Sequence, residues 1–348
     1  MKICLYSDPH WSTYSSILRQ RDIRYSKRLK TLIKSINWVE ELAFLNNCSS
    51  IFCLGDFFDR NNLNAEEITA LNEIKWSKME HTFIVGNHEI AKDDLSMNSM
   101  NVLAQIGQVV KTPLHIEFDK FNIVIIPYVD EDNRKPLDII LNDLSINVGK
   151  RTIIMSHNDI SGIRYGAYVS ESGFAIDEIE RNCELYLNGH LHNGGWVTNK
   201  ILNVGNLSGQ NFTEDGFKYK HCAFILDTDT LEVTPYENPY AINFYKVEIN
   251  NINDLSILDN LKNACASITI KESLIDNVKQ KIKSLDNIIA HRVVIVPDNK
   301  VVETNNTSDL LGKVNHLDKF NEFILNEIGN FDIVKYELEK ICNWKGKE

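Results

Sequence analysis

Five short clusters of metal-binding residue types follow one another along the first 192 residues of the chain. They contain five of its ten histidines, and each comes directly after a short apolar run. Taken singly, each could be a turn, because Asp, Asn and Gly are common where a strand ends. Five in succession favour one shared site. The clusters are Asp8-Pro9-His10, Gly55-Asp56-Phe57-Phe58-Asp59-Arg60, Gly86-Asn87-His88-Glu89, Ser156-His157-Asn158 and Gly189-His190-Leu191-His192.

The chemistry of these residue types is that of a two-metal hydrolase. Two ligands two residues apart on extended backbone, such as Asp8 and His10, would face the same side and share one ion. A carboxylate such as Asp56 can bridge two cations about 3.5–4 Å apart. Nitrogen and oxygen donors without a thiolate suit Mn, Fe, Co, Ni or Zn better than Mg or Ca alone. Water between two such ions loses a proton near neutral pH and can attack phosphorus in line.

The apolar runs before the clusters are expected to be buried strands, because they are short and rich in aliphatic and β-branched side chains. These runs are residues 3–6, 50–54, 82–85, 123–126, 152–155 and 184–187. Helical periodicity at 28–44 and 65–76 alternates with the first three runs, which indicates βαβ units and a largely parallel sheet. The carboxyl ends of such strands lie at one edge, so the five clusters can converge there.

After residue 200 the pattern becomes more β-like, with expected strands at 201–204, 222–227 and 231–234. Pro235 and Pro239 indicate a boundary. Beyond it we expect strands at 244–249 and 292–296, and helices near 254–266, 272–285, 317–328 and 333–341. The sequence therefore predicts three parts, at 1–238, 239–312 and 313–348.

Composition excludes several other classes of protein. The net charge of −11, from 48 acidic and 37 basic residues, argues against nucleic-acid binding through overall charge but leaves a local basic groove open. Seven scattered cysteines without a CxxC pair argue for free thiols in a reducing compartment. No apolar run approaches the ~18–20 residues that cross a bilayer, and the N-terminus lacks the pattern of a secretory signal. We therefore expect a cytoplasmic protein that does not bind membranes.

The ordered set Asp-x-His, Gly-Asp-x-x-Asp, Gly-Asn-His-Glu, His and Gly-His-x-His resembles the calcineurin-like metallophosphoesterase superfamily over residues 1–235. The resemblance implies an α/β fold, a two-sheet sandwich with helices on its outer faces. A small α/β cap and a helical tail would follow it. Within the superfamily the chain is similar to SbcD-type double-strand-break repair nucleases and their tailed-phage counterparts. The first motif lies at the extreme N-terminus, and a glycine-containing turn at 205–209 stands where these nucleases contact phosphate.

That similarity implies a two-metal-dependent DNA exonuclease or endonuclease, the nuclease subunit of an ATPase–nuclease complex in recombination, repair or phage genome processing. Two departures keep other functions open. Glu89 stands where these nucleases more usually carry Asp, and together with Asp59-Arg60 it is typical of Ser/Thr protein phosphatases. That phosphatase pattern, however, expects Gly and Arg where this chain has Asn61 and Val85. The alternatives are a phosphoesterase for phosphoproteins or small nucleotides, and a non-catalytic scaffold, against which the complete ligand set argues.

The resemblance implies a role for each motif residue. Two divalent transition-metal ions, Mn²⁺ in our prediction, would share the ligands Asp8, His10, Asp56 and His192 at one site and Asp56, Asn87, His157 and His190 at the other. His88 would face the scissile phosphate and stabilise charge or protonate the leaving oxygen. Asp59 and Arg60 would order the metal loop, with a phosphate contact as the alternative for Arg60.

A basic segment follows the first motif, with seven basic residues and one acidic residue between positions 19 and 34. As DNA phosphate contacts we predict Arg19, Arg21, Arg24, Lys27 and Arg28. The alternative is a solvated helix face whose cations pair with acids elsewhere. The expected partners are DNA, an SbcC-type SMC-like ATPase bound by the tail, and a second copy of the chain, in the cytoplasm of a bacterium or a phage-infected host. Sequence leaves open whether the tail packs on the cap instead.

Overall fold

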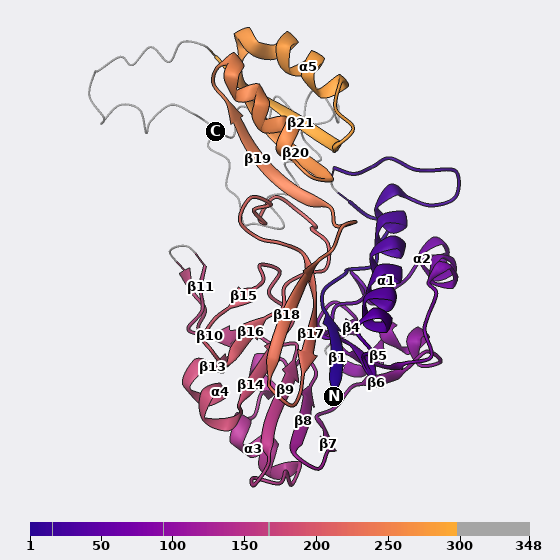
Figure 1. Cartoon of the computed structure of the whole chain (residues 1–348), viewed down its shortest axis with the longest axis vertical. Coiled ribbons are helices and arrows are strands. Elements are labelled where there is room, and N and C mark those ends of the chain that lie inside the picture. Colours follow the sequence, from indigo (N-terminus) through magenta and orange to yellow (C-terminus); the bar gives the residue numbers. More distant parts are fainter. Residues whose placement is uncertain (16, 93, 166–167, 298–348) are drawn as a thin grey trace, which may run out of the picture. The chain divides into compact units, whose positions relative to one another are not determined.

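The computed structural model describes residues 1–15, 17–92, 94–165 and 168–297. Two six-stranded sheets carry the motifs (Figure 1). The first has the order β18 (Glu232–Glu237), β17 (Cys222–Asp227), β1 (Lys2–Tyr6), β2 (Ser50–Cys53), β3 (Glu80–Ile84) and β6 (Gln108–Val110). The second has the order β15 (Gly195–Trp196), β16 (Ile201–Asn203), β14 (Leu185–Asn188), β9 (Arg151–Ser156), β8 (Phe121–Ile126) and β7 (Leu114–Glu117).

Parallel strands form the interior of both sheets, and antiparallel strands lie toward the edges. β1, β2, β3 and β6 pair in parallel, whereas β17 runs antiparallel to β1 and to β18. In the second sheet β8, β9, β14 and β16 are parallel, and β7 and β15 are antiparallel edges. The predicted strands before the five clusters are therefore confirmed, and so is the largely parallel interior.

The two sheets face each other across one apolar layer. Leu5 and Ile84 from the first sheet belong to the same buried cluster as Ile125 and Leu187 from the second. Each such side chain contributes about 1.5–3 kcal/mol when fully buried. This packing is the sandwich that the sequence predicts.

Helices cover the outer faces of the sandwich. α1 (Lys27–Leu45) and α2 (Ala65–Ala70) pack on the first sheet, and α3 (Leu137–Asp143) and α4 (Ile176–Asn182) pack on the second. α1 buries Leu29, Leu32 and Ile36 at helical spacing, and the Ser26 side chain caps it by accepting the N–H of Leu29. The helix predicted at 65–76 is shorter, since a 3₁₀ turn at Leu71–Glu73 ends it.

A third sheet follows the sandwich and contains the parallel strands β19 (Asn243–Ile249), β20 (Ala264–Lys271) and β21 (Ile288–Val296), with α5 (Ile275–Lys283) beside them. The helix predicted near 254–266 is wrong. Residues Ile252–Asn260 form a 3₁₀ helix, and the central strand β20 begins at Ala264. β20 starts with four small residues, 264–267, ahead of Ile268 and Ile270, and these small residues obscured its strand pattern.

Shorter elements complete the described ranges: β4 (Ile90–Ala91), β5 (Asp94–Asn98), β10 (Ile160–Ser161), β11 (Arg164–Tyr165), β12 (Tyr168–Val169), β13 (Phe174–Ala175) and 3₁₀ turns at Ser99–Leu103, Glu131–Asn133 and Glu272–Leu274. None of the helices in these ranges combines the length and apolar character needed to cross a bilayer. The predicted helices at 317–328 and 333–341 lie outside the described residues, as does part of the expected cap. The three-part division stays a prediction.

Candidate metal centre

The five clusters lie at the carboxyl ends of five parallel strands. In the first sheet, β1, β2 and β3 lead into the motifs that begin at Asp8, Gly55 and Gly86. In the second sheet, β9 and β14 lead into those around His157 and Gly189. Side chains from both sheets therefore converge at one end of the sandwich.

Four candidate ligands have left-handed backbone conformations, with φ of 50° at Asp8, 47° at His10, 46° at Asp56 and 72° at His190. The expectation that Asp8 and His10 share an extended backbone is therefore wrong. Their N–H groups instead donate to the carbonyls of Gly55 and Asp56, both at 3.1 Å, which turns the chain sharply. A left-handed backbone costs about 1–3 kcal/mol for a residue other than glycine, and such residues are concentrated at functional sites.

Two glycines allow the loops to approach this closely. Gly55 has φ of 104°, and a Cβ atom there would overlap the imidazole of His157. A Cβ at Gly86 would overlap a carboxylate oxygen of Asp56. Any larger residue at either position would displace a candidate ligand.

The first predicted ligand set is brought together around His10. Its Nε2 lies 3.0 Å from His192 Nε2, 3.7 Å from Asp8 Oδ1 and 3.9 Å from Asp56 Oδ2. Such short separations between would-be donors and acceptors are typical of side chains that converge on one ion.

The second set lies around His157. Its Nε2 is 3.2 Å from Asp56 Oδ2 and 3.3 Å from Asn87 Oδ1, and that same Asn87 oxygen lies 3.0 Å from His190 Nδ1. Asp56 Oδ2 thus stands between the two sets, which is the position of a bridging carboxylate. All seven predicted ligands converge.

Each of the four imidazoles turns its other ring nitrogen to an acceptor outside the cluster. The pairs are His10 Nδ1 with Asp59 Oδ1 (3.4 Å), His157 Nδ1 with the Leu54 carbonyl (2.6 Å), His190 Nε2 with Asp159 Oδ1 (3.3 Å) and His192 Nδ1 with Glu214 Oε1 (3.4 Å). The hydrogen bond to the Leu54 carbonyl fixes the tautomer of His157, and the three carboxylates lie where they can orient the other rings.

Asp159 and Glu214 were not predicted from the sequence. Asp159 stands two residues after His157, so its proximity to that motif was a usable signal. Glu214 has no such signal. It reaches His192 because Asn206 and the backbone of Gln210 donate hydrogen bonds to its carboxylate and hold it behind the imidazole.

The electrostatics of the cluster fit bound cations. Asp8 and Asp56 are fully buried, and Asp8 Oδ1 has no hydrogen-bond partner among the described residues. Burial alone would lower the pKa of His10, but Asp59 and Asp8 raise it to about 10. The carboxylate of Asp56 likewise outweighs burial and raises the pKa of His157 to about 9. In the absence of metal, protons on these imidazoles balance the negative charge of the buried carboxylates. Divalent cations bound by the same side chains would displace those protons.

Glu89 ties two of the metal-binding loops together. Its buried carboxylate accepts the N–H groups of Phe58 and Gly86, each at 2.8 Å. Burial and the neighbouring negative charge of Asp56 raise its pKa to about 8. Glu89 therefore positions the backbone beside Asp56, and the long side chain allows it to reach both loops.

His88 lies at the exposed edge of the cluster, where one of its ring nitrogens is within 4.8 Å of ligand atoms of His10 and Asp56. Its side chain is 39% exposed, and its Nε2 is 4.0 Å from Asp56 Oδ2. Its Nδ1 donates to the Asp59 carbonyl at 2.9 Å, which leaves Nε2 available to a ligand. This placement is compatible with the predicted contact to a scissile phosphate.

Asp59 and Arg60 have different partners. Asp59 contacts His10 as described above, and Arg60 Nη2 donates to the buried Glu67 at 2.8 Å. Glu67 also accepts the N–H of Thr13, so it joins the loops after β1 and β2. These contacts favour the loop-ordering interpretation over a phosphate contact for Arg60.

The prediction that Arg28 contacts DNA is wrong, because the residue is buried. Its guanidinium donates to the carbonyls of Gly209 at 3.1 Å and His10 at 3.3 Å, and so braces the first metal loop. Residues 205–209 are also buried throughout, so the turn expected to contact phosphate is not exposed to a substrate.

The exposed cations of the basic segment mostly have acidic partners. Arg21 pairs with Glu66 at 2.5 Å, and Arg24 pairs with Glu73 at 2.8 Å. Lys30 pairs with Asp22, Lys27 donates to Gln20 at 3.2 Å, and Arg19 is exposed. The alternative of a solvated face with paired cations is therefore favoured.

Comparison with solved structures finds matches of low sequence identity. TT1561 of Thermus thermophilus is 10% identical with a TM-score of 0.41, over 68% of this chain and 98% of that one. A dimetal phosphatase from Danio rerio is 13% identical with a TM-score of 0.41, over 68% and 99%. The calcineurin-like phosphoesterase YfkN from Bacillus subtilis is 10% identical with a TM-score of 0.39, over 68% and 88%. No curated protein matches the sequence.

The sequence itself provides the assignment. The model of the calcineurin-like phosphoesterase family matches residues 1–194, which include all five clusters and therefore both predicted ligand sets. Divalent metals are the cofactors of this family, in agreement with the converging side chains. The side chains that converge at the carboxyl ends of the strands are candidate ligands for those metals, and the chain belongs to the calcineurin-like phosphoesterase family.

Proposed function

We propose that the protein is a two-metal-dependent DNA nuclease of the SbcD type or of the related tailed-phage type, with Mn²⁺ as its metal. The observation that carries the proposal is the convergence of two ligand sets on Asp56, with the half-exposed His88 beside them. Two divalent cations at such ligands supply Lewis-acid stabilisation of phosphate charge and activate water at neutral pH.

The protein's own residues would orient the substrate and complete proton transfer. His88 Nδ1–H donates to the Asp59 carbonyl, so Nε2 of the neutral ring is an acceptor. When the ring is doubly protonated, Nε2 can donate a hydrogen bond to a phosphate oxygen or a proton to the leaving oxygen. The backbone N–H of His88 donates to Asp56 Oδ1 at 3.0 Å, which links the position of this imidazole to the bridging carboxylate.

Two observations favour a phosphodiester over a phosphoprotein substrate, and a third argues against a small-molecule substrate. Asn61 and Val85 replace two phosphate-handling residues of the protein phosphatases, and Val85 is fully buried. Arg60, the third residue of that kind, is paired with Glu67. The chain also continues beyond the sandwich into the sheet of β19, β20 and β21, which a phosphatase for small molecules does not need.

We further propose that the nuclease acts as a homodimer with an SMC-like ATPase on residues 313–348, which lie outside the described residues. Charge supports this proposal. A chain of net charge −11, whose basic segment is largely paired with acids, needs additional surface to hold DNA. Removal of residues 316–348 should leave Mn²⁺-dependent cleavage intact and abolish co-purification with the ATPase. Normal ATPase binding by the shortened chain would contradict this role for the tail.

A direct assay tests the proposed activity. Purified protein with Mn²⁺ receives labelled linear DNA, a phosphoserine peptide and a cyclic dinucleotide in parallel, and Asp56→Asn serves as the matched inactive control. We expect cleavage of DNA alone. Preferential hydrolysis of the peptide or of the cyclic dinucleotide would overturn the nuclease assignment and leave the phosphoesterase chemistry in place.

A further inference from the structure

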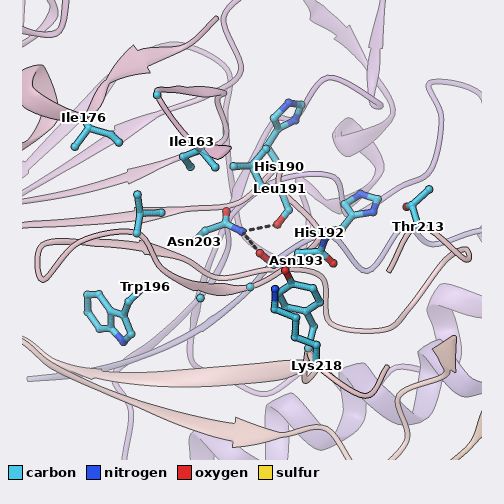
Figure 2. A pocket seen from close by; sticks show the side chains of 15 residues that line it. Ile163, Ile176, His190, Leu191, His192, Asn193, Trp196, Asn203, Thr213 and Lys218 are labelled. Carbon is cyan, nitrogen blue, oxygen red and sulfur yellow. Dashed lines mark hydrogen bonds between the residues drawn. The ribbon is translucent and has the colours of Figure 1, made fainter. Parts of the chain in front are cut away.

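A cavity of about 970 Å³ adjoins the metal centre. Two metal-ligand candidates, His190 and His192, form one part of its wall, and Trp196 forms another. Figure 2 shows the indole of Trp196 apart from these two imidazoles, with Asn203 drawn between them. The cavity thus leads from the reacting centre toward an exposed aromatic ring.

The charge of this wall differs from that of the rest of the chain. None of its lining residues is an aspartate or glutamate, and Lys218 contributes a positive charge. Three other cavities in the described ranges each include at least one carboxylate, such as Asp177, Glu40 or Glu80. In an acidic protein, a wall that includes a lysine and no carboxylate favours an anionic ligand.

The aromatic ring is presented by a fixed backbone. Trp196 is 52% exposed and lies in β15, where it pairs with Leu202 of β16. Asn203 Nδ2 donates to the carbonyls of Leu191 at 2.6 Å and Asn193 at 3.0 Å, so the same strand also holds the loop that carries His192. The distance between the aromatic ring and the metal ligands is therefore set by one hairpin.

The cation and a second ring lie together on the wall. Lys218 Nζ is 4.9 Å from the centre of the Tyr219 ring, and both residues line the cavity. Trp196 is the exposed ring of this cavity, and Lys218 brings an ammonium group to the same lining. An exposed aromatic face and an ammonium group in one site are the combination that binds single-stranded nucleic acid, because bases stack on the ring and the cation contacts phosphate.

We propose that this cavity is a nucleotide subsite for single-stranded DNA, in which a base next to the scissile phosphate stacks on Trp196 and Lys218 contacts the backbone. The proposal rests on the nuclease function and specifies its substrate as an unpaired strand or a frayed end. In a duplex both faces of each base are covered by its stacked neighbours, so an unpaired base is the form that can use the indole.

The test compares a labelled oligothymidylate with an abasic oligonucleotide of the same length, which keeps the phosphates and lacks the bases. Affinities are measured by fluorescence anisotropy on the full chain in EDTA, so that no cleavage occurs. Trp196→Ala should reduce the ratio of the two affinities by about 5- to 150-fold, the range typical for loss of one stacked base. Trp196→Phe should retain most of the ratio.

Lys218→Ala should weaken the binding of both oligonucleotides alike and flatten the salt dependence of binding by about one unit.

Phe44→Ala is the matched control, since Phe44 is an exposed aromatic residue in a separate cavity with Glu40 and Glu41. An unchanged ratio in both Trp196 variants, while the wild-type protein with Mn²⁺ cleaves oligothymidylate, would overturn the subsite and leave the nuclease function standing. Absence of any DNA cleavage by the wild-type protein would overturn the nuclease function itself. Tighter binding of a phosphoserine peptide than of oligothymidylate would reassign the cavity to phosphoproteins and also overturn the proposal.

Discussion

The metal centre and the basic segment both have unusual residue types, but the charged groups of the two regions differ in how many partners they have within the protein. In the metal centre, buried carboxylates and imidazoles converge, and Asp8 Oδ1 lacks a hydrogen-bond partner among the described residues. In the basic segment, Arg21 and Arg24 already have acidic partners, and Arg28 is buried against carbonyl groups. Residue type alone therefore does not indicate binding. The useful signal is a polar group whose bonding capacity the protein leaves unused.

The largest effect is expected from Asp56→Asn, because it removes the charge shared by both ligand sets. Mn²⁺ titration calorimetry should show fewer than two bound ions. The loss of Mn²⁺ affinity should exceed the roughly 10- to 100-fold that is typical when a residue hydrogen-bonded to a metal ligand is replaced. Hydrolysis should be lost together with the metal. A variant that still binds two ions with wild-type affinity would place the bridging role elsewhere.

His88→Ala should lower kcat by about 10²–10⁴ and leave Mn²⁺ affinity intact, since the ligand sets assigned to the two ions do not include His88 and its proposed role is at the phosphate. Calorimetry and turnover are measured on the same preparation. Loss of metal in this variant would show that His88 is a ligand, and unchanged turnover would remove it from the chemistry.

Asp159→Asn and Glu214→Gln should each weaken Mn²⁺ binding by about 10- to 100-fold, because they orient His190 and His192. Glu66→Gln, which disrupts a pair in the basic segment, is the matched control and should leave Mn²⁺ affinity unchanged. If all three substitutions changed Mn²⁺ affinity equally, Asp159 and Glu214 would have no specific role in orienting the metal ligands.

Metal loading should release protons. The pKa values of His10, about 10, and His157, about 9, lie above neutrality, so both imidazoles are protonated in the cation-free protein at pH 7. An incoming cation must displace these protons, and Mn²⁺ affinity should rise between about pH 6 and about pH 8, by up to about tenfold per unit for each proton. Calorimetry in buffers of different ionisation enthalpy counts the protons. Affinity that is independent of pH would contradict the assignment of these ligands.

The smallest effect is expected in the basic segment. Arg21→Ala and Arg24→Ala should change the salt slope of DNA binding by much less than one unit each, because both guanidinium groups are engaged by glutamates. A flattening by about one unit per variant would restore the phosphate contacts predicted from the sequence.

The sequence predicts the converging residues well because each cluster follows a buried strand, and parallel strands bring their carboxyl ends together. It does not predict the backbone at Asp8 and His10, since the left-handed turn depends on hydrogen bonds to the loop after β2. Glu214 escapes prediction for a similar reason. Its role depends on where the chain after β16 passes behind His192, and no local pattern encodes that path.

β20 escapes prediction because alanine, cysteine and serine replace the larger side chains that make strand periodicity visible. Its neighbours in the sheet supply the missing bulk, as Tyr245 and Val247 from β19 share one buried cluster with Ala264 and Ala266. Long-range packing therefore decides the conformation of this segment.

The position of β1 has a consequence for synthesis on the ribosome. β1 is an interior strand of its sheet, and one of its two partners is β17, where Leu5 lies opposite Phe224. β1 must therefore wait until residue 227 has left the exit tunnel before its sheet can close. The last predicted ligand, His192, emerges earlier than that strand. The nascent chain thus carries all the predicted ligands before the sheet that positions Asp8 and His10 is finished, and the mature geometry of the cluster forms only after β17 has been synthesised.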